Sequence, residues 1–236
     1  MRVALTIAYD GSSYLGSQIQ KETTNTIFGE LENVLSKINI DFRVVASGRT
    51  DKGVHATGQV CHIDIPQYWN DLVKFKRILN SMLPNSIKIK HIKKVDDEFH
   101  ARYSAKKRVY RYVIKQDSSN PFENQFITFI DKVDFKTLQN NIKLFIGEHN
   151  FINFMKTGSD TKSSVRFIYK AFAYTYKDSI ILNFEANGFL RSQIRLMVGS
   201  LLQLNKKEIK EQLACTNIHK IKPAPSNGLY LAKIKY

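Results

Sequence analysis

The sequence predicts an α+β fold built on a mixed sheet whose strands pair mainly antiparallel. Two observations support this class. Several short segments alternate between apolar and polar residues, as half-buried strands do, whereas others repeat apolar residues every three to four positions, as amphipathic helices do. The strand-like segments are joined by short connections such as Lys177-Asp178-Ser179. Parallel neighbours would need a crossover of about a dozen residues, so a doubly wound parallel sheet is disfavoured.

The first half of the chain is expected to combine strands with helices. Apolar residues at 3, 5, 7 and 9 alternate and predict a strand that ends in the turn at residues 10–13. Helical spacing over Ile27–Ile38, with threonines available as a cap at 24–26, predicts a helix. The other expected elements are strands at residues 43–47, 59–65, 87–95 and 109–115 and a helix marked by residues 69–83.

The second half repeats this mixture. A helix is expected from Asp134 through residue 145, and a further helix is marked by apolar residues at 194, 198, 201 and 202. Strands at 165–176 and 180–186 form a hairpin, and a strand over 229–236 closes the chain. Because Asp-Ser-Ser-Asn-Pro interrupts the pattern within 116–124, we predict two similar α/β halves, residues 1–118 and 119–236.

Composition and charge narrow the class of protein. An apolar fraction of 43% with 24% charged residues is typical of an ordered chain. The net charge is 36 − 21 = +15, and it divides as 19 − 12 = +7 over residues 1–118 and 17 − 9 = +8 over the rest. This spread of cations suits a polyanionic partner such as nucleic acid, although a Lys-rich genome would produce the same excess.

Several function classes are disfavoured by residues that the sequence lacks. Its two cysteines, Cys61 and Cys215, lie far apart, and no H-x-x-x-H pair occurs, so neither a disulfide framework nor a zinc site is expected. The N-terminal apolar run is too short for a signal peptide, and no stretch approaches the roughly 18 apolar residues of a membrane span. We therefore expect a cytoplasmic protein that has no membrane partner.

The densest polar loop covers residues 47–56, Ser-Gly-Arg-Thr-Asp-Lys-Gly-Val-His-Ala. Asp51 stands between Arg49 and Lys52, and cations on both sides favour an ionised carboxylate, which a nucleophile or charge stabiliser needs. The alternative is a turn aspartate that accepts backbone hydrogen bonds. Asp51 is the one acidic residue between Val44 and His62, which argues against a two-metal site. Because Val54 stands where a phosphate-binding loop needs lysine, that motif is absent too.

This loop, with Gly58-Gln59-Val60 after it, resembles the catalytic motif of the tRNA pseudouridine synthase A family. Further matches follow in the family's order along nearly the whole chain: Tyr9-Asp10-Gly11, Gly16 with Gln18 and Gln20, Phe99–Ala105, Arg108–Tyr112, Gly147–Phe154, Ser164 with Arg166, Asn187–Gly199 and Pro225–Leu229. The chain departs from the family pattern at Ser17, where an aromatic residue is expected, and at Arg191-Ser192-Gln193.

The resemblance implies an isomerase that converts uridine to pseudouridine at positions 38, 39 and 40 in the anticodon stem-loop of tRNA. It implies that Asp51 is the nucleophile, and that Arg195 is an active-site arginine that pairs with it. Tyr110 matches the active-site tyrosine, which stacks on the flipped uracil and relays a proton. Arg49 matches the arginine that fills the space left by the flipped base, whereas Phe189 packs against the uracil or the catalytic loop, or in the core.

The resemblance also implies a pseudouridine synthase fold with a central basic cleft, a homodimer, and no metal or organic cofactor. Tyr112 is expected to pack in the core, His55 to make structural hydrogen bonds, and Arg191 to lie one helical turn before Arg195. No DNA partner is expected. Two alternatives stay open, a non-catalytic RNA-binding protein of the same fold and a hydrolytic enzyme such as a nucleosidase or a metal-dependent nuclease.

Overall fold

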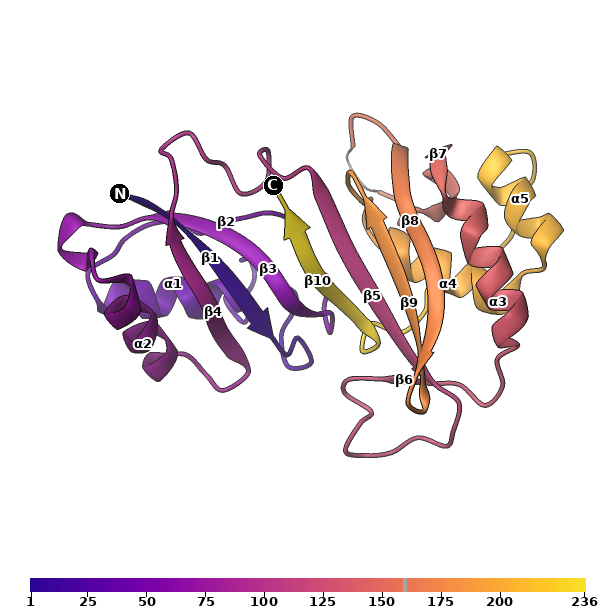
Figure 1. The fold of residues 1–236 in the computed structure, drawn as a ribbon, viewed down its shortest axis with the longest axis horizontal. Helices are drawn as coiled ribbons and strands as arrows, with labels where there is room; N and C mark the ends of the chain where they lie inside the picture. The colour runs from indigo at the N-terminus through magenta and orange to yellow at the C-terminus, as the bar shows by residue number, and fades with distance from the viewer. Residues whose placement is uncertain (159–160) are drawn as a thin grey trace. The chain divides into compact units, whose positions relative to one another are not determined.

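The computed structural model describes residues 1–158 and 161–236. The chain forms two compact units (Figure 1). Unit 1 comprises Met1–Lys106 together with the C-terminal Tyr230–Tyr236, and unit 2 comprises Lys107–Leu229. The end of the chain therefore returns to the unit in which the chain begins.

The sheet of unit 1 has the strand order β4-β1-β3-β10, with β2 beside β3. Its strands are β1 (Arg2–Tyr9), β2 (Val45–Ala46), β3 (His55–Asp64), β4 (Ile87–Lys94) and β10 (Leu229–Lys235). β1 pairs antiparallel with both neighbours, which places Tyr9 opposite Ala56 of β3 and Ile87 of β4. β10 runs parallel to β3, with Tyr230 opposite His55. The start of β3 is thus held between two strands, and this fixes the end of the loop before it.

Two α-helices complete unit 1, α1 (Ile27–Lys37) and α2 (Leu72–Met82), and a 3-10 turn, η1 (Gln67–Trp69), precedes α2. The Thr26 hydroxyl accepts the Gly29 N–H at 3.1 Å, and the Asp71 carboxylate caps α2 in the same way. The core side chains of the two helices are Ile27, Phe28, Leu31, Val34, Leu35, Phe75 and Leu79.

The sheet of unit 2 has the order β5-β9-β8-β7, with every pair in this path antiparallel and β6 parallel to β5. Its strands are β5 (Lys107–Lys115), β6 (Thr128–Phe129), β7 (Gly147–Asn150), β8 (Val165–Tyr176) and β9 (Ser179–Ala186). Tyr110 lies opposite Phe184, and Tyr112 lies opposite Leu182. Each unit therefore combines an antiparallel ladder with one parallel pair, which confirms the predicted mixed α+β class.

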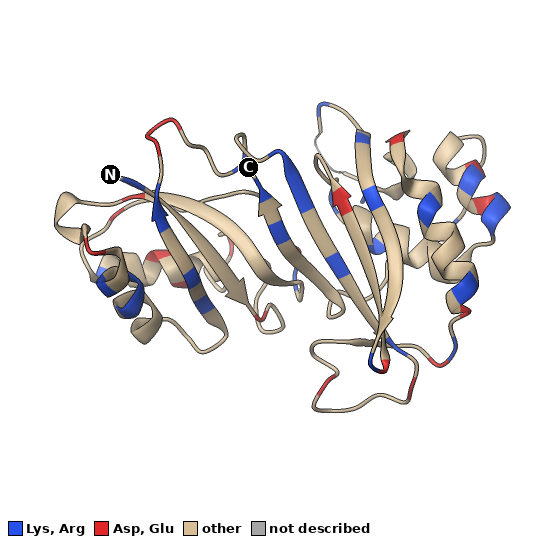
Figure 2. Ribbon diagram, viewed as in Figure 1, with Lys and Arg blue, Asp and Glu red and all other residues tan. Residues whose placement is uncertain are grey.

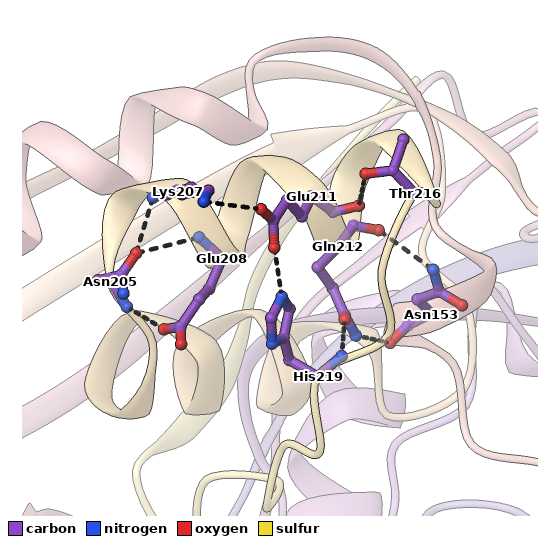
Figure 3. A network of polar contacts seen from close by, with 8 residues as sticks. All are labelled: Asn153, Asn205, Lys207, Glu208, Glu211, Gln212, Thr216 and His219. Carbon is purple, nitrogen blue, oxygen red and sulfur yellow. Dashed lines mark hydrogen bonds and ion pairs between the residues drawn. The ribbon is translucent and has the colours of Figure 1, made fainter.

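The helices of unit 2 are α3 (Phe135–Asn141), α4 (Gln193–Gln203) and α5 (Lys206–Ala214), with 3-10 turns η2 (Ile142–Phe145) and η3 (Ile152–Phe154). A polar network holds α5 in place (Figure 3). Asn205 and Glu208 form a reciprocal cap at its start. The buried Gln212 side chain donates to Asn153 O at 2.9 Å and accepts the His219 N–H at 2.7 Å.

Most predicted elements are confirmed, with ends that differ by a few residues. The expected helix over 69–83 is α2 alone, because Asp71 caps the chain after Trp69. The interrupted segment 116–124 lies inside unit 2, since β5 before it pairs with β9 along its whole length. Arg191 is not on the helix of Arg195: Ser192 has a φ of 61°, a left-handed conformation that keeps α4 from beginning before Gln193.

Residues 1–158 and 161–236 contain no helix that could span a membrane and no cluster of metal-binding side chains. None of the helices there has the length and apolar character to cross a membrane. The same residues contain no group of three or more His, Cys, Asp or Glu side chains that could hold a metal ion.

Candidate active site

The loop between β2 and β3, residues 47–54, carries Asp51 and is anchored at its start by Gln59. The Gln59 side chain is fully buried. Its Oε1 accepts the Ser47 hydroxyl at 2.6 Å, and its Nε2 donates to Gly48 O at 2.9 Å. A buried amide that bonds two consecutive loop residues fixes the direction in which the chain leaves β2.

Thr50, the residue before Asp51, is held from three sides. Its N–H donates to Ser17 Oγ at 2.9 Å, and its carbonyl accepts the Ser17 N–H at 3.1 Å. Its hydroxyl lies 2.8 Å from the hydroxyl of Tyr9. Burial raises the pKa of Tyr9 to about 12, so this phenol keeps its proton at neutral pH. Ser17, which departs from the family pattern, thus supports the backbone next to Asp51.

The loop closes in a turn directly after Asp51. The Val54 N–H donates to Asp51 O at 3.1 Å, and Gly53 has a φ of 75°, a conformation that favours glycine. Gly11 is needed for a different reason: a Cβ on Gly11 would lie 2.1 Å from Val54 O. Gly48 has neither property, because its φ is not positive and a Cβ there would meet nothing within 4 Å in the described chain. Of the two loop glycines, it is therefore Gly53 that makes the sharp turn.

The residues around Asp51 differ in exposure. Thr50 is buried, Asp51 is half-buried, and Arg49 and Lys52 are exposed. The structure therefore presents one carboxylate on an immobilised backbone, with a solvent-accessible cation on each side. Arg49 and Asp51 lie two residues apart on this loop, and their proposed roles stay a prediction.

His55 has the structural role that the sequence suggested. Its ring is buried and stacks on Tyr230 with centroids 4.9 Å apart. The Gly11 N–H points at His55 Nδ1 at 3.1 Å, and Asp10 Oδ1 lies 3.2 Å from the same nitrogen. Both contacts join the start of β3 to the turn after β1, so His55 helps to fix the end of the Asp51 loop.

In unit 2, Tyr110 and Phe189 are brought together. Their rings meet edge to face, with centroids 5.2 Å apart and an interplanar angle of 86°. Such a pair is worth roughly 0.5–1.5 kcal/mol beyond the area that it buries, and it restricts the Tyr110 ring. Both side chains remain half-exposed. Phe189 therefore packs on the proposed active-site tyrosine.

Tyr112, on the same face of β5 as Tyr110, is a core residue, as predicted. It is fully buried, and its hydroxyl lies 2.7 Å from Thr128 Oγ1 and donates to Pro225 O at 2.8 Å. Burial raises the pKa of its phenol well above the ordinary value. The two tyrosines differ in exposure, since Tyr112 is buried and Tyr110 is half-buried.

Arg195 is the third residue of α4 and is half-buried. Its Nε donates to Ala224 O at 2.7 Å, and the Ala224 N–H donates back to Arg195 O at 2.8 Å. This pair of bonds fixes the guanidinium plane and leaves the two Nη groups as donors for a carboxylate or phosphate. The expected pairing of Arg195 with Asp51 stays a prediction.

Sequence reasoning missed the residues that support the loop, Ser17 and Gln59. Both are fully buried polar side chains. Gln59 was visible as part of the Gly58-Gln59-Val60 string, but a side chain's burial cannot be read from a short motif. The signal for Ser17 was its departure from an aromatic pattern, which gave no indication that its hydroxyl bonds Thr50.

Comparison with known proteins identifies the family of the chain. The family model described as tRNA pseudouridine synthase matches residues 5–104 and 142–236. The chain is 37% identical to "tRNA pseudouridine synthase A" of Campylobacter jejuni over 241 residues, which cover all of both chains. It is also 37% identical to the protein of that name from Wolinella succinogenes, over 98% of this chain and 92% of the relative.

One solved structure, titled "Crystal Structure of a Cbf5-Nop10-Gar1 Complex", is similar at a TM-score of 0.38 and 11% identity, covering 85% of this chain and 45% of that one. The family assignment does not depend on it. The two matched ranges and the full-length relatives define an enzyme class, the RNA-modifying isomerases. The chain belongs to the tRNA pseudouridine synthase family.

Proposed function

We propose that the protein isomerises uridine to pseudouridine at positions 38, 39 and 40 in the anticodon stem-loop of tRNA, with Asp51 as the nucleophile. The observation that carries the proposal is the Asp51 loop. In a chain of this family, the residue before Asp51 is held by three hydrogen bonds to Tyr9 and Ser17. A reacting carboxylate needs such a backbone, because catalysis depends on a preorganised geometry.

The reaction breaks the bond between ribose C1′ and uracil N1 and forms a bond between C1′ and C5. In the product, the proton lost from C5 is balanced by one gained at N1, so the net change is an isomerisation that consumes no co-reactant. A carboxylate stabilises or traps an electron-poor sugar carbon in glycosidases, and Asp51 is proposed to act in the same chemical capacity on the nucleotide.

The remaining roles are assigned by motif match and local geometry. Tyr110 is proposed to stack on the uracil and to relay the C5 proton, with Phe189 holding its ring through the edge-to-face contact. Arg195 is proposed to supply the positive charge that keeps the reacting carboxylate ionised and oriented. Arg49, which is exposed beside Asp51, is proposed to fill the space that the flipped nucleotide leaves.

The proposal includes a cytoplasmic homodimer that binds tRNA, as the family resemblance implies, and a reaction that uses no metal ion or organic cofactor. Sedimentation equilibrium tests the dimer, and a single species with the mass of one chain would refute it. Activity that persists in excess chelator tests the independence from metal, and activity lost to the chelator and restored by a divalent metal would refute it.

Substitution of Asp51 separates this function from its competitors. In the Asp51→Ala variant, we expect pseudouridine formation to be lost while tRNA still binds within a few-fold of the wild-type affinity. A non-catalytic RNA-binding protein would show no pseudouridine formation with either chain. A nucleosidase or nuclease would release free uracil or cleaved RNA, and detection of either product with the wild-type chain would refute the isomerase.

A further inference from the structure

Unit 1 carries a shallow basic groove between α2 and β4, separate from the loop of Asp51. The groove has a volume of about 690 Å³. Its lining includes Lys76, Arg77 and Asn80 of α2 and Lys88, Lys90 and His91 of β4. Figure 2 shows blue segments on both of these elements.

The spacing of these cations is fixed by the backbone. The Asn80 side chain donates to Ile89 O at 3.0 Å and accepts the Ile89 N–H at 2.8 Å, so it pairs with the outer edge of β4 as a strand residue would. Lys76 Nζ donates to Lys90 O at 3.2 Å. These three bonds tie α2 to β4 and fix the backbone positions from which the side chains that line the groove extend.

Carboxylates do not neutralise this charge. Within residues 1–158 and 161–236, no ion pair within 4.0 Å joins Lys76, Arg77, Lys88 or Lys90 to a carboxylate, and none of the described residues that line the groove is acidic. The ammonium of Lys90 reaches β3, where it donates to Thr57 O. The cations of Lys76, Arg77 and Lys88 repel one another where they line the groove, so a ligand with several negative charges would relieve that repulsion.

The openness of the groove indicates what kind of anion it takes. Arg77, Lys88, Lys90 and His91 are all exposed. Small-molecule sites enclose most of their ligand's surface, whereas a phosphodiester backbone is bound along open basic surfaces. We propose that this groove binds the phosphodiester backbone of the tRNA substrate, an inference that rests on the function proposed above.

The groove lies at the same end of the unit 1 sheet as the Asp51 loop. Tyr9 is paired with both Ala56 and Ile87, so the starts of β3 and β4 are level and about 10 Å apart, two strand spacings. The Lys90 ammonium crosses this interval and donates to Thr57 O at 3.0 Å. The groove therefore binds phosphates of nucleotides close to the target uridine, within the anticodon stem.

Protection of a sheet edge is the competing explanation. β4 is the outermost strand of the unit 1 sheet, and lysines on an edge strand prevent pairing between molecules. That explanation accounts for Lys88 and Lys90. It does not account for Lys76 and Arg77, which lie on α2.

The test compares two double variants that remove equal charge. Arg77→Ala with Lys88→Ala removes two exposed groove cations that make no hydrogen bond within the described chain. Lys206→Ala with Lys210→Ala removes two exposed lysines of α5. The binding of unmodified tRNA and of an isolated anticodon stem-loop RNA is titrated from about 50 to 200 mM salt.

For the groove variant, we expect the slope of log K against log salt to fall in magnitude by about 1.4–1.8 with both RNAs, the value for two lost phosphate contacts. The dissociation constant should rise roughly 2- to 30-fold. The α5 variant should retain the wild-type slope. If the groove variant is insoluble, Arg77→Gln with Lys88→Gln removes the same charges and keeps polar side chains.

The outcomes separate the inference from the function on which it rests. A wild-type chain that binds no tRNA and forms no pseudouridine refutes the proposed function. A wild-type chain that does both, with a groove variant whose slope is unchanged, overturns only the inference. If the groove variant aggregates and its slope is unchanged, the lysines protect the sheet edge and the inference is overturned. The inference is also overturned if the slope falls equally in both double variants.

Discussion

Replacement of Gln59 by leucine tests whether the buried amide holds the catalytic loop in its reactive geometry. Leucine has a similar volume and cannot bond either the Ser47 hydroxyl or Gly48 O. The wild-type bonds measure 2.6 and 2.9 Å, and Oε1 also accepts the Val60 N–H at 3.1 Å. At about 1 kcal/mol of net stability per bond, and with a carbonyl left without a partner, the free energy of unfolding should fall by roughly 2–4 kcal/mol.

The functional effect should exceed what this loss of stability explains. A displacement of about 1 Å at a reacting group can cost roughly 100-fold in rate. We expect the single-turnover rate of pseudouridine formation, measured with saturating enzyme and corrected for the folded fraction, to fall by about 10- to 100-fold. Urea denaturation gives the stability, and tritium release from C5-labelled uridine in tRNA gives the rate.

Gln212→Leu is the matched control. Gln212 is also buried, its side chain makes two hydrogen bonds, and its network contains none of the proposed catalytic residues (Figure 3). It should lose a similar stability and keep a rate within about 3-fold of wild type. If Gln59→Leu keeps the wild-type rate, or if the rates of both variants fall equally after the correction, Gln59 does not hold the loop in its reactive geometry.

Three further predictions concern other sites. His62 is buried, and desolvation first, then Arg2 and His100, lower its pKa to about 4. Because the unfolded state then binds more protons between about pH 6.5 and 4, the free energy of unfolding should decline as pH falls through that window. His62→Asn should flatten this decline, and a variant with the wild-type dependence on pH would contradict the prediction. Phe189→Leu should lower the pseudouridine rate roughly 2- to 10-fold by freeing Tyr110, and an unaltered rate would exclude that support. Cys215 is exposed whereas burial raises the pKa of Cys61, so iodoacetamide should label Cys215 in the native protein and Cys61 only after unfolding.

Local patterns predicted the elements whose contacts are local. The alternation in residues 3–9 and the hairpin at 177–179 were readable because each strand's period and each turn's length depend on neighbouring residues. The helix after Thr26 was readable from its spacing and cap. α5 was missed although its capping pair Asn205 and Glu208 is present, because its charged sequence has a narrow apolar face.

The pairing of strands that are distant in the sequence could not be predicted from the sequence. Nothing in residues 229–236 indicates that β10 runs parallel to β3 in unit 1, because strand order depends on contacts between distant segments. The same limit applies to the site. Asp51, Arg195, Tyr110, Arg49 and Phe189 were found through motif resemblance, whereas the contacts of Thr50 with Tyr9 and Ser17 came from the structure.

The most direct test of the proposed function is to map pseudouridine in unmodified tRNA after incubation with the pure wild-type chain, beside Asp51→Ala. We expect new pseudouridine at positions 38, 39 and 40, wherever the tRNA carries uridine there, and none with the variant. Modification confined to other positions would contradict the proposed substrate. Pseudouridine formed by Asp51→Ala at the wild-type rate would contradict the assignment of the nucleophile.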